Sequence, residues 1–568
     1  MANEIELVLA LLATMTALVG LAGRVGLPSP IVLVIAGLII GVVPGLPRVA
    51  LDPDLVLLVF IPPILFEAAN YTSLRDARTY ADAIANLSIG LVLLTTGVVA
   101  VLTHAVIPGL TWPVAFALGA IVSPPDAVAA TSIIARLPVP RRISVILEGE
   151  SLVNDATALT AYRVAVALAV SGASFSLFDA SRDLLVASVG GVIVGWGVAT
   201  VAKWLYRAID DSQISITISF LSTFVAYLLA ERIHGSGIVA VVVFGLIIGR
   251  WDHHLPARVR VEGAAIWRQV TALLNGLVFV LIGLQLPGIL DGIRGQSITE
   301  VSLYGMLVSC AVVVIRILWN AIVPRVMRPF TRGTYQPLSW QETTVVGGAG
   351  MQGVISLATA LALPLRTDDG TALPQRDLVI FLAFTVILST LLLQGLTLPA
   401  LIRFLGITGD DDEGRIRSKA RLVAVRGALR RLDGVEVDAS LDDEVQDIRR
   451  HYEVRERFYE NEFYGRPDAD VLYRKHAISS LRADLIDAES AALVRLRDDE
   501  SINDRTLREI RRELDLERLR LGDRSSLPPA LSSHRRVERV PRDARGRTGA
   551  FHSILLAKPR SPATADTP

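Results

Sequence analysis

Polar and acidic side chains gather within one short stretch of an otherwise apolar segment. This stretch contains Glu150, Ser151, Asn154 and Asp155. On a helix, Ser151 and Asp155 are i,i+4 neighbours. Glu150 and Asn154 have the same spacing, so the four polar groups occupy little more than one turn. Ionisable groups in such segments are costly and usually face a cavity or one another, so the pattern predicts a site for a cation or a proton.

A second acidic position follows two adjacent prolines. Asp126 comes directly after Pro124 and Pro125 in another apolar segment. Proline lacks a backbone N–H and breaks a helix, and the freed carbonyl groups can ligate a hard cation. We therefore expect an interrupted helix with Asp126 at the interruption. Asp126 either binds the cation or caps the positive end of the second helical half, and the sequence leaves both roles open.

A single carboxylate can exchange a metal ion for a proton. Partial removal from water disfavours the charged form of a carboxylate, so protons and cations compete for it near neutral pH. We expect a cation such as Na⁺ to be bound by Asp155, Ser151 and carbonyl groups near Pro124 and Pro125, with Asp126 as the candidate further ligand. An empty, ionised site should resist crossing the membrane, because a bare buried carboxylate is costly. This cost couples the movement of the cation to the movement of the proton.

The composition places these groups in a membrane protein. The chain has 568 residues, of which 52% are hydrophobic, and a mean hydropathy of +0.48, which is too apolar for an average soluble protein. This composition makes membrane lipid the expected partner. The 56 basic and 56 acidic residues balance, so no charge imbalance argues for nucleic acid. The single cysteine, Cys310, excludes an intrachain disulfide or a CxxC site. Glu4 and Glu6 differ from the basic start of a cleaved signal peptide, so the first apolar segment is expected to stay as a membrane helix.

About thirteen apolar segments have the length of membrane-spanning helices, since a bilayer core needs about 20 helical residues. They are residues 5–23, 28–46, 54–71, 83–107, 112–136, 143–171, 182–206, 213–232, 236–250, 268–287, 301–327, 341–363 and 378–405. The expected fold class is an all-α polytopic membrane protein with a transmembrane domain over 1–409. Residues 410–524 are rich in Arg, Asp and Glu and predict a charged helical domain. Residues 525–568, rich in Pro, Ser and Arg, predict a disordered tail.

The segment at 341–363 contains an interruption that matches the one at 112–136. Its glycine-rich string, with Gly350 and Gln352, weakens the helix between two apolar stretches. The interrupted segments are the fifth and the twelfth, as expected if segments one to six repeat in inverted orientation as eight to thirteen. Paired broken helices in the two halves of a membrane chain indicate a secondary transporter with its site near the midplane.

Lysine and arginine residues predict the orientation, because they favour cytoplasmic loops. With the N-terminus outside, the inner loops hold roughly fifteen of them and the outer loops about six. An odd number of spans then puts the charged tail in the cytoplasm. We expect a multi-pass protein of the plasma (inner) membrane.

Four strings resemble the sodium/proton exchanger family of monovalent cation/proton antiporters, in its bacterial single-chain branch: GAIVSPPDAVA, EGESLVNDATAL, LNGLVFVLIGLQL and GGAGMQGVISLA. The resemblance covers roughly residues 5–405, and the pair Asn154-Asp155 is its most diagnostic element. It implies a dimerisation domain, a mobile core with two crossed broken helices, a homodimer, and electroneutral exchange of one Na⁺ for one proton without a cofactor. A K⁺/H⁺ antiporter of the same fold is the alternative.

By motif, the resemblance assigns roles to individual residues. Asp155 matches the exchanging carboxylate and Asn154 its uncharged partner, so that one carboxylate titrates per cycle. Asp126 matches the aspartate of the broken helix, and Ser151 matches a cation-ligating hydroxyl. Glu67, on the third segment, matches an acid near the site.

Two further positions concern charge balance near the site. Glu150 matches an acid that pairs with an arginine on a later helix, for which Arg316 is the match, and we expect a structural ion pair. One position departs from the pattern. Relatives have arginine where this chain has Gln352, so a positive charge near the core is missing.

Other classes of protein fit the sequence less well. An intramembrane aspartyl protease should carry a Gly-x-Gly-Asp string on a span, and the nearest approach, Gly406 to Asp410, has the wrong spacing. A passive channel would need a repeated carbonyl filter or charged rings. A membrane anchor for the tail would need no buried acids. One acidic cluster on broken helices favours alternating access, so we expect an antiporter and not an enzyme.

Overall fold

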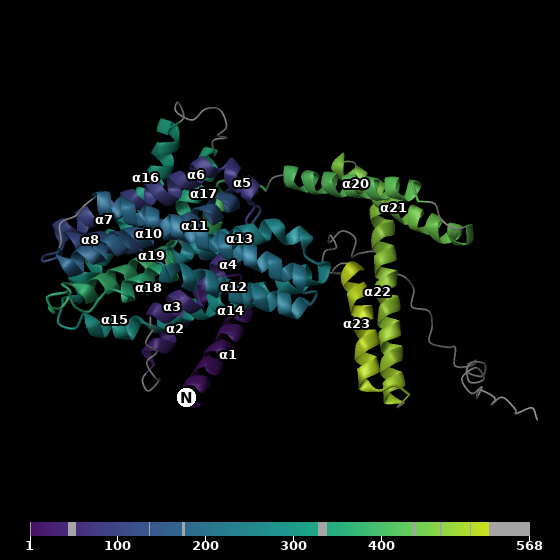
Figure 1. Cartoon of the computed structure of the whole chain (residues 1–568), viewed down its shortest axis with the longest axis horizontal. Coiled ribbons are helices and arrows are strands. Elements are labelled where there is room, and N and C mark those ends of the chain that lie inside the picture. Colours follow the sequence, from purple (N-terminus) through teal and green to yellow (C-terminus); the bar gives the residue numbers. More distant parts are fainter. Residues whose placement is uncertain are drawn as a thin grey trace, which may run out of the picture. The chain divides into compact units, whose positions relative to one another are not determined.

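The computed structural model builds the chain from helices and connecting loops (Figure 1). It describes residues 2–43, 53–135, 137–172, 177–327, 338–409, 411–435, 439–465, 469–499 and 501–521. The chain divides into two compact units, Met1–Glu413 and Gly414–Pro568. The all-α class predicted from the sequence is confirmed. The disordered tail predicted over 525–568 lies outside the described residues.

Every apolar segment expected from the sequence corresponds to one helix or to consecutive helical pieces. In chain order these are α1 (Ala2–Val25), α2 (Ser29–Val42), α3 (Pro53–Val59), α4 (Ile61–Tyr71), α5 (Leu74–Thr79), α6 (Ala81–Ala85), the π-helical turn η1 (Asn86–Leu91), α7 (Val92–Val106), α8 (Trp112–Val122), α9 (Ala127–Ile134), α10 (Arg141–Ser171), α11 (Leu177–Ala208), α12 (Ser212–Arg232), α13 (Gly237–Trp251), the 3₁₀ turn η2 (Asp252–His254), α14 (Ala257–Leu284), α15 (Leu286–Gly292), α16 (Ile298–Met327), α17 (Trp340–Gly348), α18 (Val354–Leu361) and α19 (Arg376–Phe404).

Eight helical segments among the described residues are long and apolar enough to cross a membrane. Three shorter apolar helices lie at Leu9–Val25, Ser29–Val42 and Val56–Tyr71. Neither α10, which carries several charged side chains, nor the interrupted pair α17–α18 is among the eight. The polytopic helical class is therefore confirmed, and the count of thirteen crossings stays a prediction.

Local sequence explains where the helices near the site begin. α10 begins at Arg141, directly after Pro140. α4 has Pro62 and Pro63 in its first turn, where the missing N–H groups cost no helical hydrogen bond. α17 begins with a capping box, in which Ser339 and Glu342 each bond the other's backbone N–H.

Two apolar clusters hold the first unit together. The smaller cluster joins α4, α11, α12 and α13, and the larger one includes α8, α9, α18 and α19. At the centre of the smaller cluster, the rings of Phe66 and Phe244 stack with centroids 5.3 Å apart, and Trp267 lies 4.5 Å from Phe66. α4 therefore belongs to one cluster and the broken helices to the other.

The charged tail is helical, as expected. Its elements are α20 (Asp411–Asp433), the 3₁₀ turn η3 (Ala439–Leu441), α21 (Asp442–Phe463), α22 (Ala469–Asp498) and α23 (Asp504–Leu521). Arg426 of α20 bonds Glu456 and Glu460 of α21 at 2.7 and 2.9 Å. Arg518 of α23 pairs with Asp487 of α22. An ion pair thus links α22 and α23, which also bury Ile486 and Leu507.

Candidate functional site

The two interrupted helices meet at their breaks. Residues 123–126 separate α8 from α9, and residues 349–353 separate α17 from α18. The backbone N–H of Asp126 donates to the carbonyl oxygen of Met351 at 2.7 Å, which joins the two breaks directly. Both broken helices expected from the sequence are present, and they lie against each other.

Both carboxylate oxygens of Asp126 have close neighbours. Its Oδ1 accepts a hydrogen bond from the N–H of Val128 at 2.8 Å and so caps α9. A carboxylate is favourable at this position because the N-terminal end of a helix is positive. Its other oxygen lies against Gly353, where a Cβ atom would overlap it. Asp126 also lines the cavity described below, so its capping contact and access to a cation are compatible.

The polar residues of α10 form two faces and not one cluster. Glu150 and Asn154 are 1% and 0% exposed and contact neighbouring helices. Ser151 and Asp155 line a cavity. The i,i+4 spacing holds within each pair, but one residue along a helix turns the side chain by about 100°. This rotation directs the two pairs to different neighbours.

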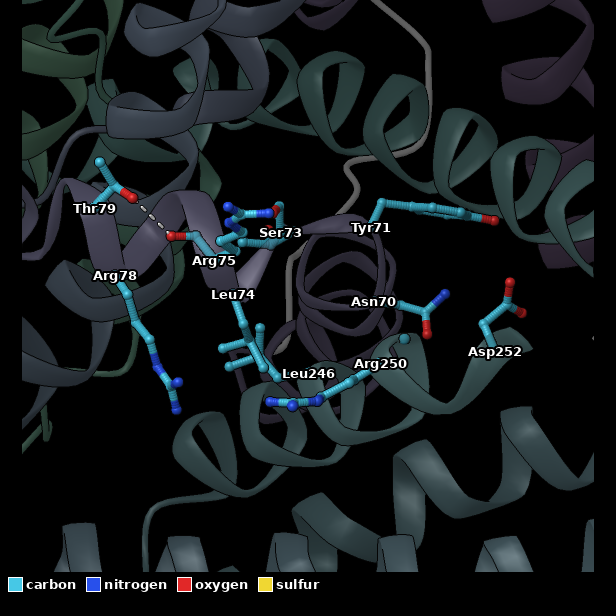
Figure 2. A pocket seen from close by; sticks show the side chains of 12 residues that line it. Asn70, Tyr71, Ser73, Leu74, Arg75, Arg78, Thr79, Leu246, Arg250 and Asp252 are labelled. Atoms are coloured by element: carbon cyan, nitrogen blue, oxygen red, sulfur yellow. Dashed lines mark hydrogen bonds between the residues drawn. The ribbon is translucent and has the colours of Figure 1, made fainter. Parts of the chain in front are cut away.

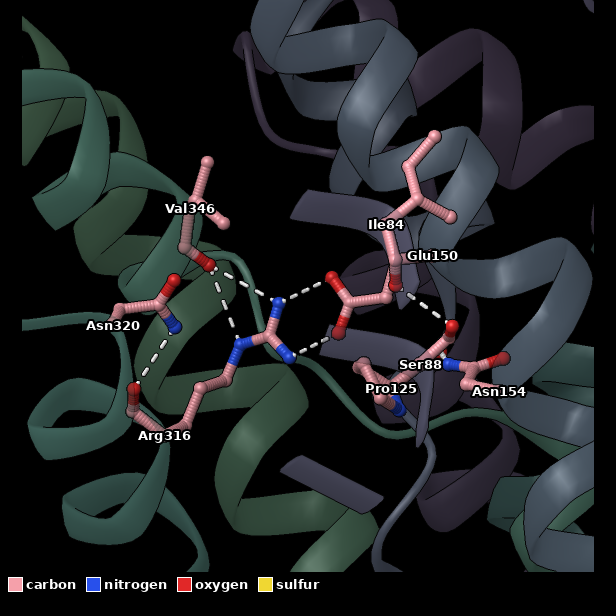
Figure 3. Close-up of polar contacts among 8 residues, drawn as sticks. All are labelled: Ile84, Ser88, Pro125, Glu150, Asn154, Arg316, Asn320 and Val346. Carbon is pink, nitrogen blue, oxygen red and sulfur yellow. Dashed lines mark hydrogen bonds and ion pairs between the residues drawn. The ribbon is translucent and has the colours of Figure 1, made fainter. Parts of the chain in front are cut away.

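Arg316 of α16 neutralises Glu150. Its two terminal nitrogens donate to the two carboxylate oxygens of Glu150 at 2.6 and 2.9 Å (Figure 3). The guanidinium group also donates to the carbonyl oxygen of Val346, at 3.1 and 3.3 Å. Val346 lies near the end of α17, where carbonyl groups lack helical partners and favour a positive charge. The expected pair is present, and it ties α10, α16 and α17 together.

Asn154 fastens α10 to the first break. Its Nδ2 donates to the carbonyl oxygen of Pro125 at 2.9 Å (Figure 3). One lone pair of a carbonyl that the sequence suggested as a Na⁺ ligand is therefore already engaged. The Oδ1 atom of Asn154 is buried and has no hydrogen-bond partner within the described part of the chain.

A cavity of about 780 Å³ lies between α4, α9, α10, α14 and α18. Four of the residues singled out from the sequence line it: Glu67, Asp126, Ser151 and Asp155. They come from α4, from the first break and from α10. The structure thus brings together three acids and one hydroxyl that are spread over 89 positions of the sequence, between Glu67 and Asp155 inclusive.

Asp155 is buried without a partner. The residue is 5% exposed, and its carboxylate makes no hydrogen bond or ion pair with any residue that the structure describes. A buried charge without a partner is costly. Because the side chain borders a cavity, a cation or a proton can reach it and offset this cost.

Residues 8–404 match the model of a protein family described as "Sodium/hydrogen exchanger, transmembrane". The match covers more than half of the chain and includes both broken helices and the cavity. The chain belongs to the sodium/hydrogen exchanger family. It is therefore a multi-pass membrane transporter and not an enzyme, and exchange of a monovalent cation for protons is its class of activity. The aspartyl protease considered from the sequence is excluded.

The exchanger is similar to characterised and uncharacterised relatives. It is 32% identical over 527 residues to an uncharacterised Na⁺/H⁺ exchanger of Mycobacterium tuberculosis, which is 91% of this chain and 96% of that one. It is 32% identical over 413 residues to the sodium, potassium, lithium and rubidium/H⁺ antiporter of Bacillus subtilis. This match covers 70% of this chain and 61% of the relative. Its fold matches the sodium proton antiporter MjNhaP1 of Methanocaldococcus jannaschii, with a TM-score of 0.56 and 18% sequence identity. This match covers 72% of this chain and 98% of MjNhaP1.

Sequence reasoning missed several polar residues of the exchanger's cavity, among them Tyr71, Glu148, Arg268 and Asn275. Glu148 had a signal, because it precedes Ser151 by three positions and Asp155 by seven, which places all three on one helical face. Arg268 and Asn275 come from α14, and no spacing along the chain indicates that α14 packs here.

Gln352 of the glycine-rich string is buried in the second break. It is 1% exposed, and its backbone N–H donates to the hydroxyl of Thr390 at 3.1 Å. A positive charge does reach the same broken helix from another element, because Arg316 is 4% exposed and bonds Val346 of α17.

Proposed function

We propose that the exchanger carries Na⁺ and protons in opposite directions across the plasma membrane, one for one, with both ions competing for Asp155. The observation that carries this proposal is the buried carboxylate of Asp155, which faces a cavity and lacks a partner among the described residues. Such a group needs a cation or a proton, and each excludes the other because binding of either removes the negative charge.

The same cavity offers further oxygen ligands for Na⁺, which hard cations prefer. The hydroxyl of Ser151 lies one turn before Asp155 on α10, and the carboxylate of Asp126 lies at the first break. In this proposal Asn154 positions the break through its bond to Pro125. Glu67 is an acid on the α4 wall that attracts cations into the cavity.

One carboxylate exchanges its ion in each cycle. Glu150 is neutralised by Arg316, and Asn154 carries no charge. Asp126 stays in place as the cap of α9. Protonation of Asp155 alone then releases one Na⁺, so the exchange moves no net charge and uses no cofactor.

The cavity supports access from one side. On α10 the residues that line it run from Glu148 to Asp155, in the first half of the helix. With the N-terminus outside, this half is the cytoplasmic one, so the conformation faces inward. Exchange then requires that this path close and that another open on the far side. The same orientation places the tail from residue 410 in the cytoplasm.

Homodimer formation is part of the proposal. α11 exposes large apolar side chains, among them Ile193, Trp196 and Trp204. Lipid or a second copy covers such a surface in the membrane. The family resemblance favours a second copy.

K⁺ is the second candidate cation. The Bacillus subtilis relative is named as an antiporter of sodium, potassium, lithium and rubidium, which are monovalent cations of different sizes. The ligands proposed here are oxygen atoms, which any of these ions can use.

Transport by purified protein in lipid vesicles tests the proposal. A dye inside the vesicles reports pH while Na⁺, K⁺, Li⁺ or Rb⁺ is added outside. We expect Na⁺-driven proton movement in the native exchanger that an imposed voltage does not change. An Asp155→Asn variant should show none, and the matched control Glu300→Gln, which removes an exposed acid at the start of α16, should transport normally. Proton movement that persists in Asp155→Asn contradicts the proposal.

A further inference from the structure

A second cavity, of about 830 Å³, lies where α4 ends and α13 ends (Figure 2). Its walls come from the end of α4, the following turn and α5, and the last turns of α13. It is separate from the cation cavity, but Tyr71 lines both. In the predicted orientation this end of the molecule is cytoplasmic.

Close packing of α4 on α13 forms this cavity. At Gly249 a Cβ atom would overlap the carbonyl oxygen of Asn70, so only glycine lets the two backbones approach this closely. The next residue, Arg250, is thereby held beside the end of α4. The turn after α4 then brings Arg75 and Arg78 of α5 to the opposite wall.

Three guanidinium groups and one carboxylate line this cavity. Arg75, Arg78 and Arg250 form no ion pair with any acid in the described ranges, and the single acid in the lining is Asp252. The acid nearest to two of them in sequence, Asp76, pairs with Arg141 at 2.9 Å. Arginines in the first turns of α10 and α14 have carboxylate partners: Arg142 pairs with Glu342, and Arg258 pairs with Glu262.

The arrangement of the side chains points to one place in the cavity. In Figure 2, Arg78 and Arg250 extend toward the same region, whereas Arg75 turns toward Ser73. Asn70, at the end of α4, lies beside Arg250 in the same lining. The cavity therefore offers two guanidinium groups that extend toward one region.

We propose that this cavity binds a phosphate-bearing anion. A guanidinium fork matches the oxygens of a phosphate in shape and charge, so Arg78 and Arg250 bind the phosphate. Leu74 and Leu246 supply an apolar wall for the carbon skeleton of the ligand. Two sources have this chemistry: the headgroup of an anionic phospholipid such as phosphatidylglycerol, and a soluble sugar or glycerol phosphate. A bound ligand would contact Tyr71 and hence the wall of the cation cavity.

Thermal unfolding of the full-length exchanger in uncharged detergent tests this proposal. One arm titrates phosphatidylglycerol, with phosphatidylcholine as the neutral reference. The other arm titrates glycerol 3-phosphate, added as its choline salt. Choline chloride at equal ionic strength is the reference, so that the Na⁺ concentration stays constant. We expect a saturable rise in melting temperature in at least one arm. The arm that gives it identifies the source as membrane lipid or soluble phosphate.

Paired variants show whether the effect belongs to the cavity. In Arg78→Gln/Arg250→Gln, half-saturation should need about tenfold more ligand, which corresponds to about 1.4 kcal/mol of binding free energy. The control Arg24→Gln/Arg403→Gln removes two exposed arginines that lie outside the cavity and should titrate like the native chain. If the double variant is too unstable to purify, Arg78→Gln alone should give a smaller shift in the same direction. Absence of stabilisation in both arms, or equal weakening in the control, overturns the proposal.

Discussion

Glu150 and Asp155 lie five residues apart on the same helix, and both are almost fully buried, at 1% and 5% exposure. Arg316 holds Glu150 through two hydrogen bonds, whereas Asp155 has no partner among the described residues and borders a cavity. Burial alone therefore does not distinguish a structural acid from an ion-binding one. The distinction comes from whether a fixed positive charge or a mobile one balances the carboxylate.

The helix itself produces this difference. Five residues of an α-helix turn by about 500°, which leaves the two side chains about 140° apart around the axis. One side faces α16 and α17, and the other faces the cavity between the two apolar clusters. A single residue inserted between the two acids would rotate one of them by about 100° relative to the other, away from its present neighbours.

The largest effect on transport should follow from removing the unpaired acid, Asp155. Asp155→Asn keeps the size of the side chain but cannot titrate, so transport should fall to the background of empty vesicles. Because the native carboxylate has no protein partner to lose, the melting temperature should not fall. Vesicle transport and thermal unfolding measure the two properties, with Glu300→Gln as the control. If Asp155→Asn still transports, or if it unfolds at a lower temperature than the native protein, Asp155 and Glu150 would not differ in role as described.

The paired acid should behave in the opposite way. Glu150→Gln leaves Arg316 buried without a counter-charge, which should cost about 3–5 kcal/mol of stability and reduce the yield of folded protein. The double variant Glu150→Gln/Arg316→Gln removes the orphaned charge and should recover part of that stability. Thermal unfolding in detergent measures both. Normal stability together with a changed Na⁺ requirement in Glu150→Gln would mean that Glu150 is a ligand.

A smaller effect should come from the contact between the two breaks. Gly353→Ala places a Cβ atom on the carboxylate of Asp126, which should cost about 1–3 kcal/mol and raise the Na⁺ concentration for half-maximal transport about tenfold. Gly347→Ala is the matched control, because a Cβ atom there meets nothing closer than 3.8 Å. If the two variants have the same stability and the same Na⁺ dependence, the position of Asp126 does not matter for Na⁺ binding.

The smallest effect should come from the neutral ligand on the cavity face. Ser151→Ala removes one hydroxyl and leaves the carboxylate of Asp155, so the Na⁺ concentration for half-maximal transport should rise about threefold to tenfold. The maximal rate should stay within about twofold of the native value. Ser132→Ala removes another hydroxyl that lines the same cavity and serves as the control. The assignment of Ser151 as a ligand fails if the two variants have the same Na⁺ dependence.

Much of the fold could be predicted from the sequence because its causes are local. Apolar runs specify helices, and the adjacent Pro124 and Pro125 must interrupt one because they lack N–H donors. The glycine-rich string around Gly350 weakens another. The positions of both breaks follow from these residues. Their mutual contact, through the N–H of Asp126 and the carbonyl of Met351, depends on packing that no local pattern specifies.

The site could be predicted only in part, for the same reason. The spacing of Ser151 and Asp155 indicates a shared face, and Glu148 could have been added by extending that spacing by one more turn. The sequence grouped Glu150 and Asn154 with them, because spacing along one helix does not say which neighbour each face meets. Arg268 and Asn275 reach the cavity from α14 and needed the tertiary structure to be found.

Release of protons on Na⁺ binding tests the central claim most directly. Na⁺ is added to the purified exchanger in weakly buffered detergent near neutral pH, and the protons set free are measured together with the bound Na⁺. If both ions compete for Asp155, the native protein should release up to one proton for each Na⁺ bound, and Asp155→Asn should release none. Equal proton release from the native protein and from Asp155→Asn would show that the exchanging acid lies elsewhere.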